Sequence, residues 1–194
     1  MNNKITFGIG GIVIGLVLAG VFGGTMFSGY NNGNSGMMGN IDQHFIEQMI
    51  PHHEGAIAMA NLALERATHP EIKTLAEAIL KAQTAENQDM RAWYQDWFGK
   101  SVPEGAPSMM GGMMSQGGMH MGNTQDIDAL KNASDFDKEF IEQMIPHHQM
   151  AIMMARMLES GTSRSEMLEL ADNIQTSQSR EIQQMQEWYK NWYK

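Results

Sequence analysis

The sequence predicts an all-α protein in which two repeated helical hairpins form one four-helix bundle. The nine residues FIEQMIPHH occur twice, at 45–53 and at 140–148, and the surrounding segments 42–98 and 137–193 share 25 of 57 aligned residues without a gap. An internal repeat of this kind indicates a duplicated structural unit. Apolar residues recur in both copies at steps of three and four, which is the helical period. Because a lone hairpin would bury too little apolar surface to be stable, we expect the two hairpins to share one bundle.

The first hairpin is predicted over residues 42–99. Asp42 can cap its first helix, and Pro51 lies inside that helix, where it removes a backbone hydrogen bond and should bend the chain. A break and restart of the helix at Pro51 is the alternative. The segment 68–71 combines a capping residue with an early proline, which predicts the start of the second helix. Gly99 predicts its end.

The second hairpin is predicted over residues 135–194, with its turn at 160–162. Residues 28–41 are predicted to be a flexible tether and residues 100–134 a linker, because their Gly-, Met- and Ser-rich stretches show no apolar period. Aromatic residues end the second helix of each hairpin, and we expect them to close one end of the bundle. They are Trp93, Tyr94, Trp97, Trp188, Tyr189 and Trp192.

Residues 1–27 contain an apolar run, 5–27, that carries no charge. A helix of this length would be roughly 34 Å long, enough to cross a bilayer. Lys4 precedes the run and no Lys or Arg follows before Arg66, so the positive-inside rule places the body of the protein outside the cytoplasm. We therefore expect a membrane anchor and a periplasmic or other extracytoplasmic location. A cleaved signal segment is the alternative.

The composition excludes several classes of function. The net charge of −9 makes nucleic acid an unfavourable partner. The chain contains no cysteine, which excludes disulfides, thiolate zinc sites and thiol nucleophiles. Methionine occurs 20 times. Some of these side chains can fill a core, but those outside the helical segments have no packing role.

The core-facing stripe of each second helix is polar at its middle, where Gln83 and Glu86 stand in the first copy. A carboxylate on such a stripe is costly unless it is paired or bound to a metal. The paired histidines, His52 and His53, lie about as many residues before the turn near Thr68 as Gln83 and Glu86 lie after it. In an antiparallel hairpin the two groups therefore share one height, and the methionines one turn further along also meet.

The sequence thus predicts two equivalent clusters of soft and borderline ligands. The first is Met49, His52, His53, Gln83, Glu86 and Met90, and the second is Met144, His147, His148, Gln178, Glu181 and Met185. Neighbouring helical residues differ by about 100°, so only one histidine of each pair should point fully inward, and the other should lie at the flank or point outward. The alternative is a buried His–Glu bond that sets helix register, with methionine as filler.

Thioether and imidazole groups together suit Cu(I) and Ag(I). A thioether site is also durable outside the cytoplasm, where thiols are oxidised. Glu86 or Glu181 could orient a ligating imidazole without touching the metal. The duplication of the cluster, and a separate Met-rich segment with no packing use, favour the metal interpretation.

Further methionines lie outside these clusters. In the linker we predict a flexible soft-metal tether, with a featureless linker as the alternative; its residues are Met109, Met110, Met113, Met114, Met119, His120 and Met121. Met150, Met153, Met154 and Met157 mostly share one helix side and are interpreted as core. His44 and His69 have no histidine at the equivalent repeat position and are interpreted as surface residues.

The copies MIPHHEGAIAMA and MIPHHQMAIMMA, each followed by L-A-x-x-I-x-x-x-Q-x-x-E-x-x-x-M-x-x-W, resemble the ferritin-like bacterial domain of unknown function 305 over about residues 42–193. The resemblance implies a ferritin-like four-helix bundle that binds Cu(I), with Ag(I) as a mimic, in copper resistance. It places that role on the twelve positions of the two clusters.

The sequence therefore favours a copper metallochaperone or sequestering factor, not an enzyme, that acts with the metal ion and with a protein that transfers copper. A structural or adaptor bundle with core histidines is one alternative. A ferritin-like di-iron oxidase is another, although no Glu in the chain is followed three residues later by His.

Overall fold

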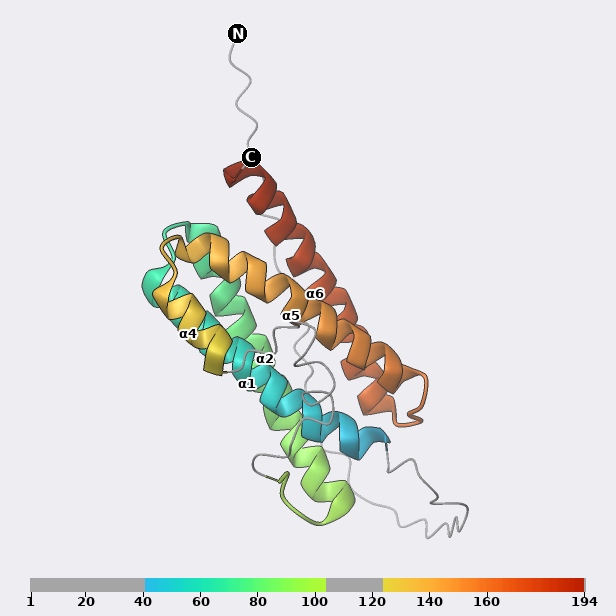
Figure 1. Cartoon of the computed structure of the whole chain (residues 1–194). Coiled ribbons are helices and arrows are strands. Elements are labelled where there is room, and N and C mark those ends of the chain that lie inside the picture. The colour runs from blue at the N-terminus through green and yellow to red at the C-terminus, as the bar shows by residue number, and fades with distance from the viewer. Residues whose placement is uncertain (1–40, 104–123, 194) are drawn as a thin grey trace. The chain divides into compact units, whose positions relative to one another are not determined.

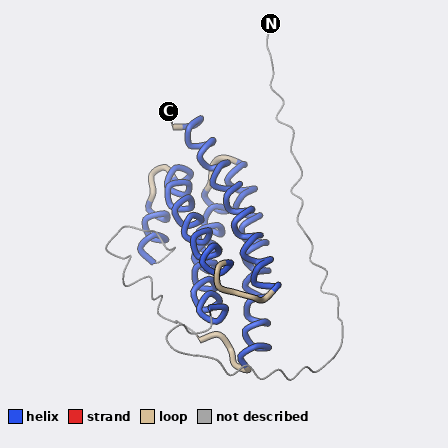
Figure 2. The backbone as a smooth tube through the Cα atoms, turned by 90° about the vertical axis from the view of Figure 1, so that its right-hand side faces the viewer, coloured by secondary structure: helices blue, strands red, loops and turns tan. Residues whose placement is uncertain are grey.

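The computed structural model describes residues 41–103 and 124–193, and this part of the chain folds into helices joined by short loops (Figures 1 and 2). The helices are α1 (Ile41–Arg66), α2 (Pro70–Phe98), α4 (Thr124–Asn132), α5 (Phe136–Glu159) and α6 (Ser165–Trp192). The prediction of an all-α fold with two long helical hairpins is confirmed.

Local chemistry explains where the helices begin and end. Gly99 adopts a left-handed conformation with φ of 67° and ends α2, as the sequence predicts. Pro70 begins the same helix, where its missing N–H removes no helical bond. The Asp135 carboxylate accepts a hydrogen bond from the Lys138 N–H and caps α5. Helix α1 continues through Pro51, so the predicted alternative of a broken helix does not occur.

The two hairpins meet through their first helices. Helix α1 packs against α2, α5 packs against α6, and α1 packs against α5. Helices α1 and α5 run in opposite directions (Figure 1). Equivalent parts of the two repeats are therefore related by an approximate two-fold axis, and each first helix is covered on two sides.

This arrangement produces two apolar cores. The first core combines the C-terminal half of α1 with the N-terminal half of α5 and includes Met59, Phe140, Met144 and Met185. The second core combines the N-terminal half of α1 with the C-terminal half of α5. It includes Phe45, Met49, Met90, Tyr94 and Met154. Between them lies the part of α1 and α5 that carries the paired histidines.

The aromatic residues at the ends of α2 and α6 do not close the same end, contrary to the prediction. Trp93 and Trp97 stack at 5.7 Å between ring centroids and pack against the second core. Trp188 and Trp192 stack at 5.6 Å and pack against the first core. The prediction was wrong because the antiparallel contact of α1 and α5 sends equivalent positions of the two hairpins to opposite ends.

Part of the segment predicted as linker forms helix α4, which packs against α1 and α5. Leu130 is fully buried there, and Ile127 packs beside it on the first core. The Arg66 guanidinium donates hydrogen bonds to the backbone carbonyls of Leu130, Lys131 and Ala133 at the end of α4. Two apolar anchors in nine residues are too weak a pattern to predict a helix that depends on tertiary contacts.

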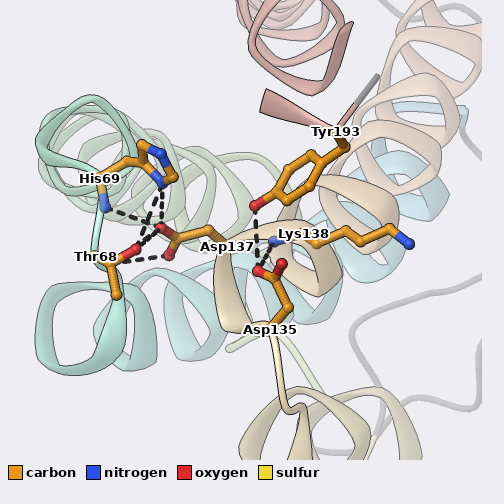
Figure 3. Close-up of polar contacts among 6 residues, drawn as sticks. All are labelled: Thr68, His69, Asp135, Asp137, Lys138 and Tyr193. Atoms are coloured by element: carbon orange, nitrogen blue, oxygen red, sulfur yellow. Dashed lines mark hydrogen bonds and ion pairs between the residues drawn. The ribbon is translucent and has the colours of Figure 1, made fainter. Parts of the chain in front are cut away.

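Equivalent polar contacts join the hairpins at both ends. The Asp137 carboxylate accepts from the backbone N–H groups of Thr68 and His69 and lies 2.6 Å from His69 Nδ1 (Figure 3). At the repeat-related place, Arg164 Nε lies 3.1 Å from Asp42 Oδ2. Positions 69 and 164 therefore perform the same task with different residues.

His69 is not a simple surface residue, contrary to the prediction. Besides Asp137, it contacts Trp192, whose ring stacks on the imidazole at 3.7 Å between centroids. The sequence could not show this, because Asp137 and Trp192 belong to the other hairpin. His44 is exposed, as predicted.

In the parts of the chain that the structure describes, no helix is long and apolar enough to cross a membrane. The predicted anchor or signal segment at 1–27 and most of the predicted tether lie outside those parts.

Replacing Asp137 with Ala should lower the free energy of unfolding by about 1–3 kcal/mol, because the N–H groups of Thr68 and His69 lose a buried acceptor. Urea unfolding measures this change. Asp42→Ala should also destabilise the protein, through the other end of the same interface. The control Asp172→Ala lies at an exposed position of α6 and should change stability by less than about 0.5 kcal/mol. An Asp137 variant as stable as the control would contradict the assignment.

Candidate metal centre

The two PHH motifs form one buried polar layer between the apolar cores. His52 is 2% exposed, and His53, His147 and His148 are fully buried. The amide side chains of Gln83 and Gln178 are buried in the facing segments of α2 and α6. A layer of this composition inside a helical protein is costly unless its polar atoms find partners.

The second histidine of each pair faces the partner helix of its own hairpin. His53 Nε2 lies 2.7 Å from Glu86 Oε2, and His148 Nε2 lies 2.6 Å from Glu181 Oε2. Both carboxylates are only partly buried, so they reach solvent at the edge of the layer. These contacts place the histidines and the polar segments of α2 and α6 at the same height, as the antiparallel geometry predicts.

The first histidine of each pair faces the other hairpin. The rings of His52 and His147 lie 3.7 Å apart between centroids, on the approximate two-fold axis. The expectation that one histidine of each pair lies at the flank or points outward was wrong. Neighbouring residues do differ by about 100°, but α1 is covered by α2 on one side and by α5 on another, so both directions are interior.

Six imidazole nitrogens in this layer have no hydrogen-bond partner. They are Nδ1 and Nε2 of His52, Nδ1 of His53, Nδ1 and Nε2 of His147, and Nδ1 of His148. A buried polar atom without a partner costs about 1–3 kcal/mol. When the Nε2–H of His53 or His148 donates to its glutamate, Nδ1 carries the lone pair and stays buried without a partner. Hydrogen bonding of one ring nitrogen to a carboxylate while the other is free is the arrangement found around histidine metal ligands.

Electrostatics keeps the central histidines neutral. Burial, together with the neighbouring imidazoles of His53 and His148, lowers the pKa of His52 to about 3, although a contact with the His147 backbone acts in the opposite direction. Burial and the surrounding histidines also hold the pKa of His147 well below its ordinary value. Neutral imidazole is the form that binds metal, so no proton must be displaced at ordinary pH.

The thioethers predicted for the clusters are buried beside this layer. Met49, Met90, Met144 and Met185 are all fully buried. Met49 and Met90 belong to the second apolar core, and Met144 and Met185 belong to the first. Met49 precedes His53 by one helical turn, which places the two side chains on one face of α1. Thioether sulfur therefore borders the layer on both sides.

Among the described residues, no group of three or more His, Asp or Glu side chains is placed to hold a metal ion. Hard ions take oxygen ligands, chiefly carboxylates. A soft ion such as Cu(I) or Ag(I) can take thioether sulfur with imidazole nitrogen instead. The donor set of this layer fits a soft monovalent ion.

Sequence reasoning missed two features of the layer. The contact of His52 with His147 merges the two predicted clusters into one, and it depends on how the hairpins dock. Asn87 is buried with its side-chain oxygen unpartnered, and it follows Gln83 by one turn on the same stripe. The spacing of four residues could have predicted that Asn87 joins the polar layer. The equivalent residue in the other repeat is the apolar Ile182, however, so comparison of the repeats did not indicate a polar position there.

The other predicted methionines differ in their surroundings. The linker residues Met109, Met110, Met113, Met114, Met119, His120 and Met121 lie outside the residues that the structure describes. On α5, Met150 and Met154 are buried, as expected for core, and Met153 is partly buried. Met157 is 53% exposed and does not fit the core interpretation.

The fold and the site define a duplicated helical protein, and the chain belongs to the family described as Domain of unknown function (DUF305), which matches residues 42–189. No curated protein matches the chain.

Among solved structures, the chain is similar to the protein CopM. "CopM in the Cu(I)-bound form" shares 50% identity with a TM-score of 0.69, covering 79% of this chain and 98% of that chain. "CopM in the Ag-bound form (by soaking)" shares 49% identity with a TM-score of 0.68, covering 79% and 97%. A DUF305 fragment from Deinococcus radiodurans shares 25% identity with a TM-score of 0.67, covering 78% and 96%.

Lowering the pH should destabilise the metal-free protein through the central histidines. The unfolded chain protonates His52 and His147 below their ordinary pKa of 6.5, whereas the folded protein keeps His52 neutral down to about 3. The unfolded state then binds more protons, so the free energy of unfolding falls as the pH drops below about 6.5, by up to about 1.4 kcal/mol per pH unit for each histidine.

Urea unfolding from about pH 7 to about pH 4 measures this slope, which other groups also influence. The double variant His52→Leu and His147→Leu isolates the contribution of the two histidines and should show a flatter pH dependence. An equal slope in the parent protein and the variant would contradict the assignment.

Proposed function

We propose that this protein binds Cu(I), with Ag(I) as a mimic, in the buried histidine–methionine layer. The observation that carries the proposal is the set of unpartnered, neutral imidazole nitrogens bordered by buried thioethers. The similarity to CopM, which has been solved with Cu(I) and with silver, supports the choice of metal. Cu(I) would here be the cargo of the protein, not a catalytic cofactor.

Each repeat supplies the same parts to such a site. In the first repeat, His53 would bind through Nδ1 while Glu86 holds its other nitrogen, and Met49 and Met90 would contribute sulfur. In the second repeat, the equivalent residues are His148, Glu181, Met144 and Met185. His52 and His147 lie between the two sets and carry free nitrogens toward the shared centre. The layer therefore offers the same donor types to both repeats.

In its cellular role, we propose a metallochaperone or sequestering factor in copper resistance, not an enzyme. A buried soft site favours holding an ion away from solvent, which suits storage or transfer. The charge distribution around the apolar run 5–27 supports an extracytoplasmic location as part of this proposal. A partner that receives or donates copper is part of the same proposal.

Removing the thioether and imidazole donors of one repeat should remove the ion bound there. Met49→Leu, His53→Leu and Met90→Leu are combined in the first variant, and the equivalent changes at 144, 148 and 185 make the second. Anaerobic titration of the full-length chain with Ag(I), followed by native mass spectrometry, measures the number of ions bound. Met59→Leu, which changes a buried methionine outside the layer, is the matched control and should bind as the parent does.

A bound ion must also stabilise the native state. Excess Ag(I) at about a hundred times its dissociation constant should add about 2.7 kcal/mol to the free energy of unfolding. A melting temperature that silver leaves unchanged, together with unchanged binding in both combined variants, would favour the alternative of a structural bundle with core histidines.

The two glutamates should tune affinity without binding the ion themselves. Glu86→Gln and Glu181→Gln keep a hydrogen-bond acceptor but lose the charge that supports the imidazole, so silver affinity at the affected repeat should fall about 10–100-fold. Competition titrations with a soft chelator measure this change. Glu54→Gln on the exposed face of α1 is the control, and an equal effect there would contradict the role of Glu86.

A further inference from the structure

A surface groove lies between the start of α1 and the end of α5. Its lining includes Ile41, Phe45 and Leu158 together with three side chains that can bind soft metals, His44, Met154 and Met157, and its volume is about 290 Å³. Met157 is 53% exposed, although it is a large apolar side chain. His44 is exposed as well, with Nδ1 at 3.9 Å from Glu47 Oε2.

The repeat provides a comparison for this groove at the other end of the protein. The equivalent residues there include Phe136 and Glu139 on α5 and Met59 and Leu62 on α1. Helix α4 packs against α1 and α5 at that end, and its Leu130 joins the same apolar core as Phe136 and Met59. No described helix covers the groove at the start of α1 in this way.

The residues of the open groove differ from their counterparts in a consistent direction. His44 stands where the covered groove has Glu139, and Met157 stands where it has Leu62. Met154 corresponds to Met59, so the thioether is present at both ends. Compared with the covered groove, the open groove therefore has one additional imidazole, from His44, and one additional thioether, from Met157. Together with the Met154 thioether they make three donors of the kind that bind a soft monovalent ion. The Glu47 carboxylate beside His44 adds negative charge that favours a cation.

The same side of α5 connects this groove with the histidine layer. His147, Met150, Met154 and Met157 follow one another at steps of three, four and three, so they form one stripe along the helix. Their exposure rises along this stripe, from a fully buried His147 through 4% at Met150 and 7% at Met154 to 53% at Met157. The first repeat has Gly55 in place of Met150, so it has no such stripe.

We propose that His44, Met154 and Met157 form a surface capture site for a soft monovalent metal ion, at the outer end of a methionine stripe that leads to the buried layer. The proposal that the groove binds the ion depends only on the residues of the groove, whereas the proposal that the ion passes to the histidines rests on the proposed function. The site is expected only at this end of the protein, because α4 covers the equivalent groove.

The test uses the full-length chain, labelled with ¹³C at the methionine methyl groups, and adds Ag(I) without oxygen. The methyl signals of Met154 and Met157 should shift together as silver binds. The double variant His44→Gln and Met157→Leu should bind one silver ion fewer in native mass spectra. These two side chains are exposed, so the variant should fold as the parent does. Met153→Leu, on the same helix but outside this groove, is the matched control and should bind as the parent does.

Three outcomes separate this proposal from the proposed function. If the Met154 and Met157 signals respond even when Met49, His53 and Met90 are all replaced by Leu, the groove binds silver independently of the layer donors that border its own core, as proposed. The Met49 methyl signal follows silver binding in the buried layer. If silver reaches the layer more slowly in the double variant than in the parent, while its affinity for the layer is unchanged, delivery from the groove is supported. Unmoved Met154 and Met157 signals with an unchanged silver count would overturn the capture site, whatever the buried layer does.

Discussion

The contact between α1 and α5 at the paired histidines is the constraint on which the rest of the structure depends. Because the two helices pass in opposite directions, His52 and His147 meet ring to ring at 3.7 Å. The same crossing divides the interior into two apolar cores and sends the equivalent aromatic residues to opposite ends. It also brings the start of each first helix against the start of the other hairpin's second helix, where Asp137 meets His69 and Asp42 meets Arg164.

The histidine layer is unfavourable as packing alone. Apolar residues of similar size would remove the cost of burying imidazole nitrogens that have no hydrogen-bond partner. The glutamates relieve only one nitrogen of His53 and one of His148, and they leave the inward nitrogen free. Burial then keeps His52 neutral. A layer that is costly without a ligand, yet occurs in both repeats, is well arranged to gain stability from a bound soft ion.

The differences between the repeats are as informative as the identities. At positions 69 and 164, a histidine and an arginine serve the same contact, so that difference leaves the architecture unchanged. The cover that α4 gives to one groove, and the methionines of α5 that border the other, break the two-fold relation. Among the residues that the structure describes, these departures place exposed soft donors, His44 and Met157, at one end, whereas the buried donors are nearly symmetric.

The sequence by itself determined the helical hairpins, their turns and the pairing of histidines with glutamates, because these follow from periodicity and from distances counted along one chain. His53 meets Glu86 for that reason. Only the tertiary structure decided that His52 faces His147, that His69 is held by Asp137, and that residues 124–132 form a helix. Those contacts join segments whose spacing in sequence carries no geometric information. These contacts depend on the angle and direction in which the two hairpins pack against each other, although each hairpin can be predicted separately.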